Sequence, residues 1–183
     1  MLLLASTLLR CGGASSIPTV SQSSGPTPGP PSFGPQGTTV VQVANEGWVH
    51  VAEGSVVRYP NNPPASGPHY PVWARYEEFT SVLPRGYWVH NLEHGAVVFL
   101  YRPDTPSATV DALRAVYRGL PPDSTCGHVL ALMTPDPELP KPIAAVAADW
   151  TLTADGVDAP TIQSFVAAHR NRAPERVCTP GTR

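Results

Sequence analysis

Proline constrains this chain more than any other residue, because it occurs too often to allow long regular elements. It makes up 23 of the 183 residues, well above the usual level of about 5 per cent. Each proline lacks an amide hydrogen and fixes its own backbone, so it interrupts helices and central strands. The composition therefore predicts short elements joined by many ordered loops, in a chain of suitable length for one domain.

The chain opens with a segment that is typical of protein export. An apolar run, residues 2–9, leads to Cys11, and small polar residues follow. The run is too short to span a bilayer, and its position favours a bacterial lipoprotein signal, residues 1–11, in which Cys11 becomes the lipidated N-terminus. An ordinary secretory signal or a frayed hydrophobic terminus is the alternative, because Arg10 stands where a small residue is usual. We expect an extracytoplasmic protein of the bacterial cell envelope, held at the membrane by its lipid anchor.

Composition divides the remainder into a tether and a domain. Residues 12–38 consist mainly of Gly, Ser, Pro, Thr and Gln, with almost nothing to bury. Such a segment stays extended, and we expect a disordered tether there. Residues 39–183 are then expected to form a single globular domain.

Two cysteines follow the predicted lipidation site, and in an exported protein they would lie in an oxidising compartment. Cys126 and Cys178 form an even pair in an oxidising compartment, which favours a disulfide. The bridge would close a loop of about 50 residues and contribute about 4 kcal/mol in the chain-entropy model. Two free buried thiols, or a thiolate ligand to copper, are the alternatives.

The periodicity of the domain predicts an α+β fold with a mostly antiparallel sheet. Residues 96–101, 128–134 and 143–153 have the apolar character of strands. Residues 106–120 form the clearest helix, and a second helix begins at Asp158, a capping residue, and extends to His169. A long proline-rich loop, residues 54–79, carries several aromatic side chains and is expected to wrap around the sheet.

The stretch WVHNLEHG, residues 88–95, places two histidines four residues apart just before a predicted strand. In a strand, His90 and His94 would lie about 13 Å apart and could not share a metal ion. Gly95 suits the left-handed end of a helical turn, however, and in that turn the two imidazoles lie on the same side. Glu93 would then point elsewhere, as a helix cap or as an outer carboxylate that accepts an imidazole N–H.

A third imidazole comes from the proline-rich loop, where His69 lies between Pro68 and Pro71. Three imidazoles, His69, His90 and His94, form a ligand set that suits zinc or copper. His50 is a fourth possibility. The alternative is structural, with the histidines hydrogen-bonded to loop carbonyls.

Other chemistries find little support in the sequence. A formal net charge of −2 gives no basic surface for nucleic acid. The serines do not lie in a nucleophile elbow, and no phosphate-binding glycine motif is present. His128, His169 and the tryptophans suit structural roles.

Four segments resemble the domain of unknown function 3105 family, which consists of exported or membrane-tethered bacterial proteins. They are NPPASGPHYPVW, PRGYWVHNLEHGAVVFLY, PIAAVAADW and IQSFVAAHRNRAPE, and the resemblance covers roughly residues 45–178. It implies an extracytoplasmic domain but no particular activity. Because His69, His90, Glu93 and His94 lie in these segments, the resemblance favours a shared histidine site.

Two classes of function follow. The first is a lipid-anchored domain that binds copper or zinc through His69, His90 and His94, with hydrolysis by a metal-bound water as one use of such a site. The second is a non-enzymatic envelope module that binds a protein or glycan. In that module the histidines brace the loop, and Tyr59, Tyr70 and Trp73 form the contact surface.

Overall fold

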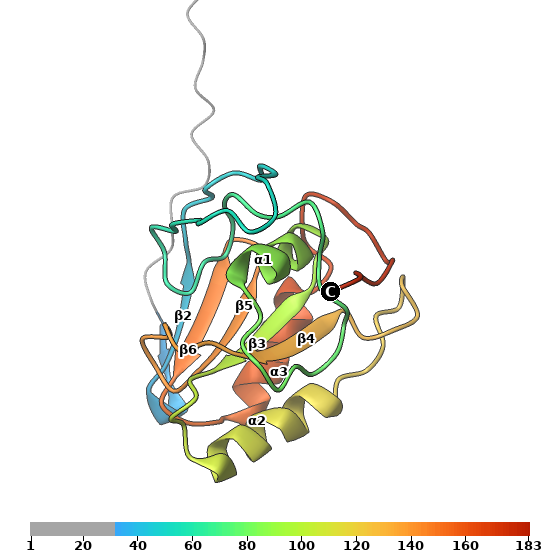
Figure 1. The fold of residues 1–183 in the computed structure, drawn as a ribbon. Coiled ribbons are helices and arrows are strands. Elements are labelled where there is room, and N and C mark those ends of the chain that lie inside the picture. Colours follow the sequence, from blue (N-terminus) through green and yellow to red (C-terminus); the bar gives the residue numbers. More distant parts are fainter. Residues whose placement is uncertain (1–31) are drawn as a thin grey trace, which may run out of the picture.

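The computed structural model describes residues 32–183, which form one mixed sheet with helices on both of its faces (Figure 1). The predicted signal segment with Cys11, and most of the predicted tether, lie outside these residues. The α+β class predicted from the sequence is confirmed. Among the described residues, no helix is both long enough and apolar enough to cross a bilayer.

The elements follow one another in a β-rich order with three α-helices. The strands are β1 (Ser32–Gly34), β2 (Thr38–Gln42), β3 (Val97–Tyr101), β4 (Ala131–Pro135), β5 (Ile143–Ala147) and β6 (Trp150–Ala154). The helices are α1 (Arg85–Glu93), α2 (Ser107–Arg118) and α3 (Ala159–His169), and a 3-10 turn, η1 (Pro35–Gly37), separates β1 from β2.

The sheet has the strand order β1-β2-β6-β5-β3-β4 and is antiparallel except for the pair β3 and β4. Parallel neighbours need a crossover connection, and α2 provides it between β3 and β4. The mostly antiparallel sheet that the sequence predicted is therefore present, with one parallel pair at its β4 edge.

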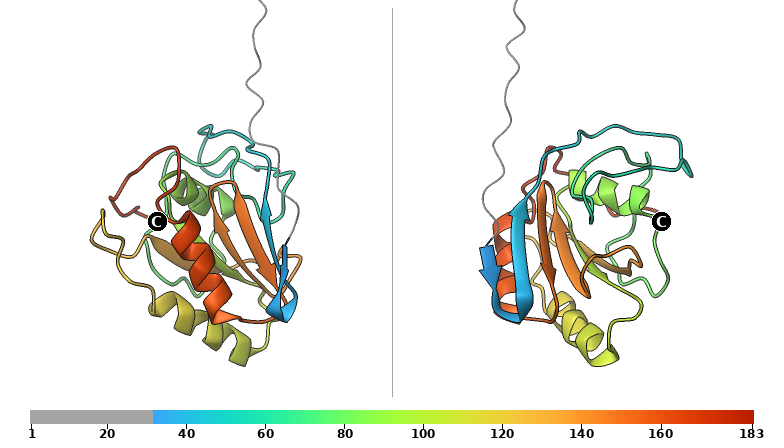
Figure 2. Two further views of the ribbon diagram at one scale, coloured as in Figure 1. Left: turned by 180° about the vertical axis from the view of Figure 1, so that it is seen from behind. Right: turned by 90° about the vertical axis from the view of Figure 1, so that its left-hand side faces the viewer.

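Both faces of the central strands are buried, which explains why residues 96–101 are uninterruptedly apolar. In β3, Val97 and Phe99 pack with α2 and α3. Val98 and Leu100 point the other way and pack with α1 and the loop. Figure 2 shows the resulting layers, with α3 on one face of the sheet and α1 on the other.

Helices α2 and α3 lie within the ranges that the sequence predicted. Helix α3 is capped by Asp158, whose Oδ2 accepts the Thr161 N–H at 3.2 Å, as expected for an N-cap. His169 stacks on Trp150 with ring centroids 4.4 Å apart at the end of this helix, in the structural position expected for it.

Three predicted elements differ in the structure. Residues 143–153 form not one strand but the hairpin β5–β6, whose turn is made by Ala148 and Asp149, with Asp149 at φ +62°. A whole helix, α1, replaces the single turn predicted near His90, so the fold has three helices rather than two. Within the predicted tether, residues 32–37 form β1 and η1, so regular structure is present before residue 39.

The proline-rich segment covers the α1 face of the sheet, as predicted, and extends over residues 43–84 (Figure 1). Its Ala65 and Ala74 are buried against Trp88 and Leu92 of α1. The loop also pairs with the outer edge of β4, where the Phe79 N–H donates to the Met133 carbonyl at 2.7 Å. This pairing covers an otherwise open strand edge.

The structure joins Cys126 to Cys178 in a disulfide with Cα atoms 5.1 Å apart. The bond connects the segment between α2 and β4 with the C-terminal tail, residues 170–183. The free-thiol and copper-thiolate alternatives are therefore wrong for this pair. Its position matters for the site, because the tail passes over the C-terminal end of α1.

Candidate metal centre

Helix α1 ends in a Schellman turn, which sets the direction of the side chains near its C-terminus. Gly95 has φ +87°, a conformation that glycine adopts without the steric cost of a Cβ. The Gly95 N–H donates to the Leu92 carbonyl and the Ala96 N–H to the Asn91 carbonyl, each at 2.9 Å. Gly95 therefore terminates the helix as the sequence predicted, and β3 begins two residues later.

The helical spacing brings the two histidines of WVHNLEHG together. Nε2 of His90 lies 3.2 Å from Nε2 of His94, as expected for residues four apart on one helix. The strand alternative, with the rings far apart, is wrong. Both residues are buried, with exposed fractions of 2% and 3%.

Two sides of α1 are buried, and they differ in chemistry. Trp88, Val89 and Leu92 pack into the apolar layer above the sheet. The polar side faces the loop, where the Asn91 side-chain amide donates to the Ala74 carbonyl at 2.8 Å and its Oδ1 accepts the Ala74 N–H at 3.0 Å. Asn91 thus fixes the loop against the helix, a role that its sequence context did not reveal.

His69 and His90 are each held by a backbone carbonyl at Nδ1. The contacts are 2.9 Å from His69 Nδ1 to the Gly67 oxygen and 2.6 Å from His90 Nδ1 to the Tyr70 oxygen. A carbonyl oxygen only accepts, so the ring hydrogen lies on Nδ1 and a neutral ring presents a lone pair at Nε2. This arrangement, in which an outer acceptor fixes the tautomer, is typical of metal-bound histidines.

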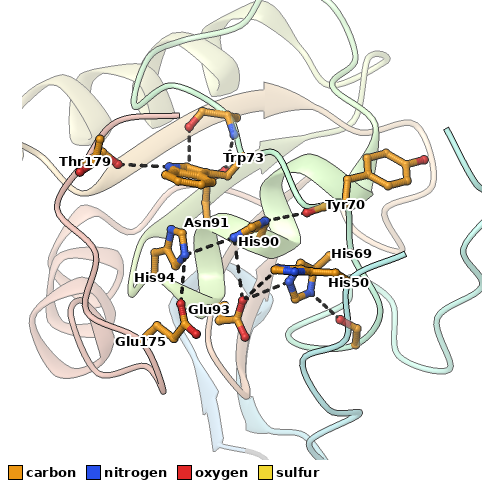
Figure 3. A network of polar contacts seen from close by, with 12 residues as sticks. His50, His69, Tyr70, Trp73, His90, Asn91, Glu93, His94, Glu175 and Thr179 are labelled. Atoms are coloured by element: carbon orange, nitrogen blue, oxygen red, sulfur yellow. Dashed lines mark hydrogen bonds and ion pairs between the residues drawn. The ribbon is translucent and has the colours of Figure 1, made fainter. Parts of the chain in front are cut away.

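The free nitrogens converge on the Glu93 carboxylate (Figure 3). Glu93 Oε2 lies 3.1 Å from His69 Nε2 and 3.9 Å from both His90 Nε2 and His50 Nε2. One ligand atom from each of these four residues lies within 4.8 Å of all the others. Ligand atoms bonded at about 2.0–2.1 Å to one tetrahedral zinc ion lie roughly 3.3 Å apart, so small movements would close this set around an ion.

His50 forms the solvent-facing side of this set. It pairs with His69 in an isolated parallel bridge between two parts of the loop, and the ring centroids of the two residues are 4.9 Å apart. The His50 side chain is 54% exposed, whereas those of His69 and His90 are 0% and 3% exposed. An ion bound here would therefore be reached from the His50 side.

His94 belongs to a second group on the other side of Glu93. Its Nε2 lies 3.4 Å from Glu175 Oε2, and ligand atoms of Glu93, His94 and Glu175 all lie within 4.8 Å of one another. The ring is packed between Trp73 and His90, with centroid distances of 4.6 and 4.5 Å. Its Nδ1 is buried without a hydrogen-bond partner among the described residues.

Burial shifts the pKa values of three residues, His90, Glu93 and His94, in the direction of their uncharged forms. It lowers the pKa of His90 and that of His94 to about 4, and neighbouring imidazoles contribute to both shifts. Burial also raises the pKa of Glu93, with the His69 charge opposing and the Glu175 charge adding to that shift. Neutral imidazoles are the form that binds metal ions.

The structure divides the predicted ligand set of His69, His90 and His94. It places His69 and His90 together, as the spacing suggested, but groups His94 with Glu175. Glu93 was expected to be a helix cap or an outer carboxylate that accepts an imidazole N–H; it does contact an imidazole, with Oε2 3.1 Å from His69 Nε2, but it lies between the histidines rather than outside them. His50, considered only as a fourth possibility, is part of the first group.

Glu175 was not among the site residues predicted from the sequence. It lies in the C-terminal tail and reaches α1 only through the tertiary fold, where its N–H donates to the Glu93 carbonyl at 3.1 Å. The segment IQSFVAAHRNRAPE contains it, but nothing in that segment marks this carboxylate as different from others in the chain.

The aromatic residues of the loop are turned toward the protein. The Tyr59 hydroxyl donates to the Pro68 carbonyl and the Tyr70 hydroxyl to the Ser55 carbonyl, each at 2.8 Å. Tyr70 is 7% exposed, and the Trp73 indole N–H donates to the Thr179 carbonyl at 3.1 Å. These hydrogen bonds brace the loop and the tail. Tyr59 and Trp73 stay partly exposed, so a contact surface formed by the three residues stays a prediction.

Fold and site together define a small α+β domain with a buried histidine and carboxylate cluster at the end of one helix. The family described as "Protein of unknown function (DUF3105)" matches residues 50–180, which span the loop, the cluster and the sheet from β3 to β6. The chain belongs to this family, and the resemblance seen in the sequence is confirmed. No curated protein and no solved structure matches the chain.

Proposed function

We propose that this protein is a lipid-anchored extracytoplasmic domain that binds a transition metal ion, zinc or copper, through His50, His69, His90 and Glu93. The observation that carries the proposal is the convergence of three imidazole Nε2 atoms on one buried carboxylate, with the Nδ1 atoms of His69 and His90 fixed by carbonyls. A proton on His69 would satisfy one of these contacts. A metal ion would satisfy all four residues at once.

The chemistry of the donors supports zinc or oxidised copper. Imidazole and carboxylate suit Zn²⁺ and Cu²⁺, whereas Cu⁺ prefers thiolate and thioether sulfur. Among the described residues, Cys126 and Cys178 are joined in the disulfide, and Met133 is buried in the core on the far face of the sheet. No described sulfur is therefore available to the cluster.

The disulfide supports the proposed location outside the cytoplasm. Disulfides form and persist in oxidising compartments and are rare in the cytosol. A lipid at Cys11 would hold the domain at the membrane, and mass spectrometry of the mature N-terminus tests that part independently.

The experiment that tests metal binding compares two histidine substitutions. Untagged full-length protein is purified with its disulfide formed, freed of metal with a chelator, dialysed against zinc sulfate, and examined by elemental analysis. We expect at least one zinc ion per chain in the wild type and at least a tenfold loss of affinity in His90→Ala, since one ligand is lost. His128→Ala, which changes a histidine outside the cluster, should bind zinc like the wild type.

Circular dichroism establishes that both variants are folded before their metal contents are compared. A wild type without zinc or copper after reconstitution would contradict the proposal. Equal zinc contents in the wild type and a folded His90→Ala would contradict it as well.

A further inference from the structure

Glu93 is shared by two groups of potential ligands. One consists of Glu93 with His50, His69 and His90, and the other of Glu93 with His94 and Glu175. The two groups do not merge into one set in which every ligand atom lies within 4.8 Å of the rest. A single ion therefore cannot take all six residues as they lie in the structure.

The second group is built into the fold, because backbone contacts on both sides of Glu175 fix the tail. The Glu175 N–H donates to the Glu93 carbonyl at 3.1 Å, and the Asn171 N–H donates to the Gly95 carbonyl at 2.8 Å. Cys178 follows three residues after Glu175 and is held by the disulfide. The carboxylate of Glu175 thus starts from a fixed backbone position beside His94.

The charges in the second group favour the binding of a cation. The group joins two carboxylates with a buried imidazole, and among the described residues neither carboxylate forms an ion pair with an Arg or Lys side chain. Ligand atoms of Glu93 and Glu175 lie within 4.8 Å of each other, and two like charges at such a distance repel. A divalent ion between them would replace this repulsion with attraction.

We propose that the cluster is a dinuclear centre, in which Glu93 bridges one divalent ion held by His50, His69 and His90 and a second held by His94 and Glu175. A carboxylate has two oxygens, so it can serve two ions. Paired ions in proteins lie about 3.5–4 Å apart. Nitrogens that are 3.2 Å apart, as those of His90 and His94 are, can each bind one ion of such a pair.

This inference rests on the proposed function and adds the second ion and its ligands. The test counts bound zinc in full-length, disulfide-bonded protein by equilibrium dialysis against zinc sulfate and elemental analysis. We expect two zinc ions per chain in the wild type and one in Glu175→Gln, which keeps the size of the side chain and removes its charge. The matched control is Glu138→Gln, a carboxylate that is 72% exposed and lies outside the cluster, and it should retain two.

The outcomes separate the two proposals. One zinc ion in both the wild type and Glu175→Gln would overturn the dinuclear centre and leave the first site intact. Two zinc ions in Glu175→Gln would place the second ion elsewhere and also overturn it. A wild type that binds no zinc would overturn both proposals.

Loading with Cu²⁺ tests the bridging role of Glu93 by a separate readout. Two Cu²⁺ ions on one carboxylate couple magnetically, so the wild type with two equivalents should give less electron paramagnetic resonance signal than two isolated ions. Glu175→Gln with one equivalent should give the full signal of one ion. A full signal from both ions in the wild type would exclude the shared carboxylate.

Discussion

At the scale of single residues, the cluster depends on where hydrogens are placed as much as on which residues are present. The carbonyls of Gly67 and Tyr70 hold the Nδ1 hydrogens of His69 and His90, so that the Nε2 atoms of both rings are left to face Glu93. Asn91 contributes indirectly by holding the loop on α1 through its two contacts with Ala74. Residues that fix a ligand in this way affect metal affinity although they do not touch the ion.

Gly95 is a residue whose replacement by alanine should destabilise the end of α1 strongly for so small a change. An alanine there would have to adopt φ +87°, and its Cβ would lie 2.9 Å from the Asn171 Cα. The left-handed conformation alone costs roughly 1–2 kcal/mol, and the crowding against the tail backbone adds to it. We expect Gly95→Ala to lower the free energy of unfolding by more than about 2 kcal/mol, measured by urea denaturation.

Gly54→Ala is the matched control, because Gly54 has φ +82° and its Cβ would meet nothing within 4 Å. The control should show the conformational cost alone. If Gly95→Ala and Gly54→Ala lowered the free energy of unfolding equally, crowding between the tail and residue 95 would be excluded.

At the scale of elements, the features predicted best from the sequence were those that depend on neighbouring residues. Asp158 and Pro160 start α3, Gly95 ends α1, and an unbroken apolar run forms β3, because caps, turns and strands follow from neighbouring residues. The full length of α1 escaped prediction since both of its sides are buried, one apolar and one polar, so it lacks the usual amphipathic pattern. The β5–β6 hairpin was missed because its turn uses Asp149 at positive φ rather than glycine.

The tail is the element whose attachment should matter most for the second ion. The Cys126–Cys178 bond spans 52 residues, and removing a native disulfide from a small secreted domain typically costs about 2–5 kcal/mol. We expect Cys126→Ser/Cys178→Ser to be destabilised by such an amount in urea denaturation. The variant should also bind the second zinc ion at least several-fold more weakly in dialysis, because Glu175 is less well fixed.

The first zinc site serves as the internal control for that variant, since His50, His69 and His90 lie in the loop and in α1. Its affinity should stay within a few-fold of that of the wild type. A second ion bound as tightly as before would contradict the role assigned to the tail.

At the scale of the whole molecule, the site is a product of tertiary structure. The spacing of His90 and His94 and the rigid surroundings of His69 could be recognised in the sequence. The sequence does not show that Glu93 and His50 lie beside these histidines, or that Glu175 reaches the end of α1. These positions depend on how the loop and the tail pack on α1. A single sequence reveals ligands that are close along the chain far better than ligands that the fold brings together.

Metal binding at the end of α1 is best tested by an anomalous difference map, recorded at the zinc edge, from crystals of the zinc-loaded full-length protein. The account predicts a strong peak about 2.0–2.2 Å from the Nε2 atoms of His69 and His90 and from the Glu93 carboxylate. No peak at the end of α1, or zinc bound only at the protein surface, would contradict it and would leave the histidines as structural braces of the loop.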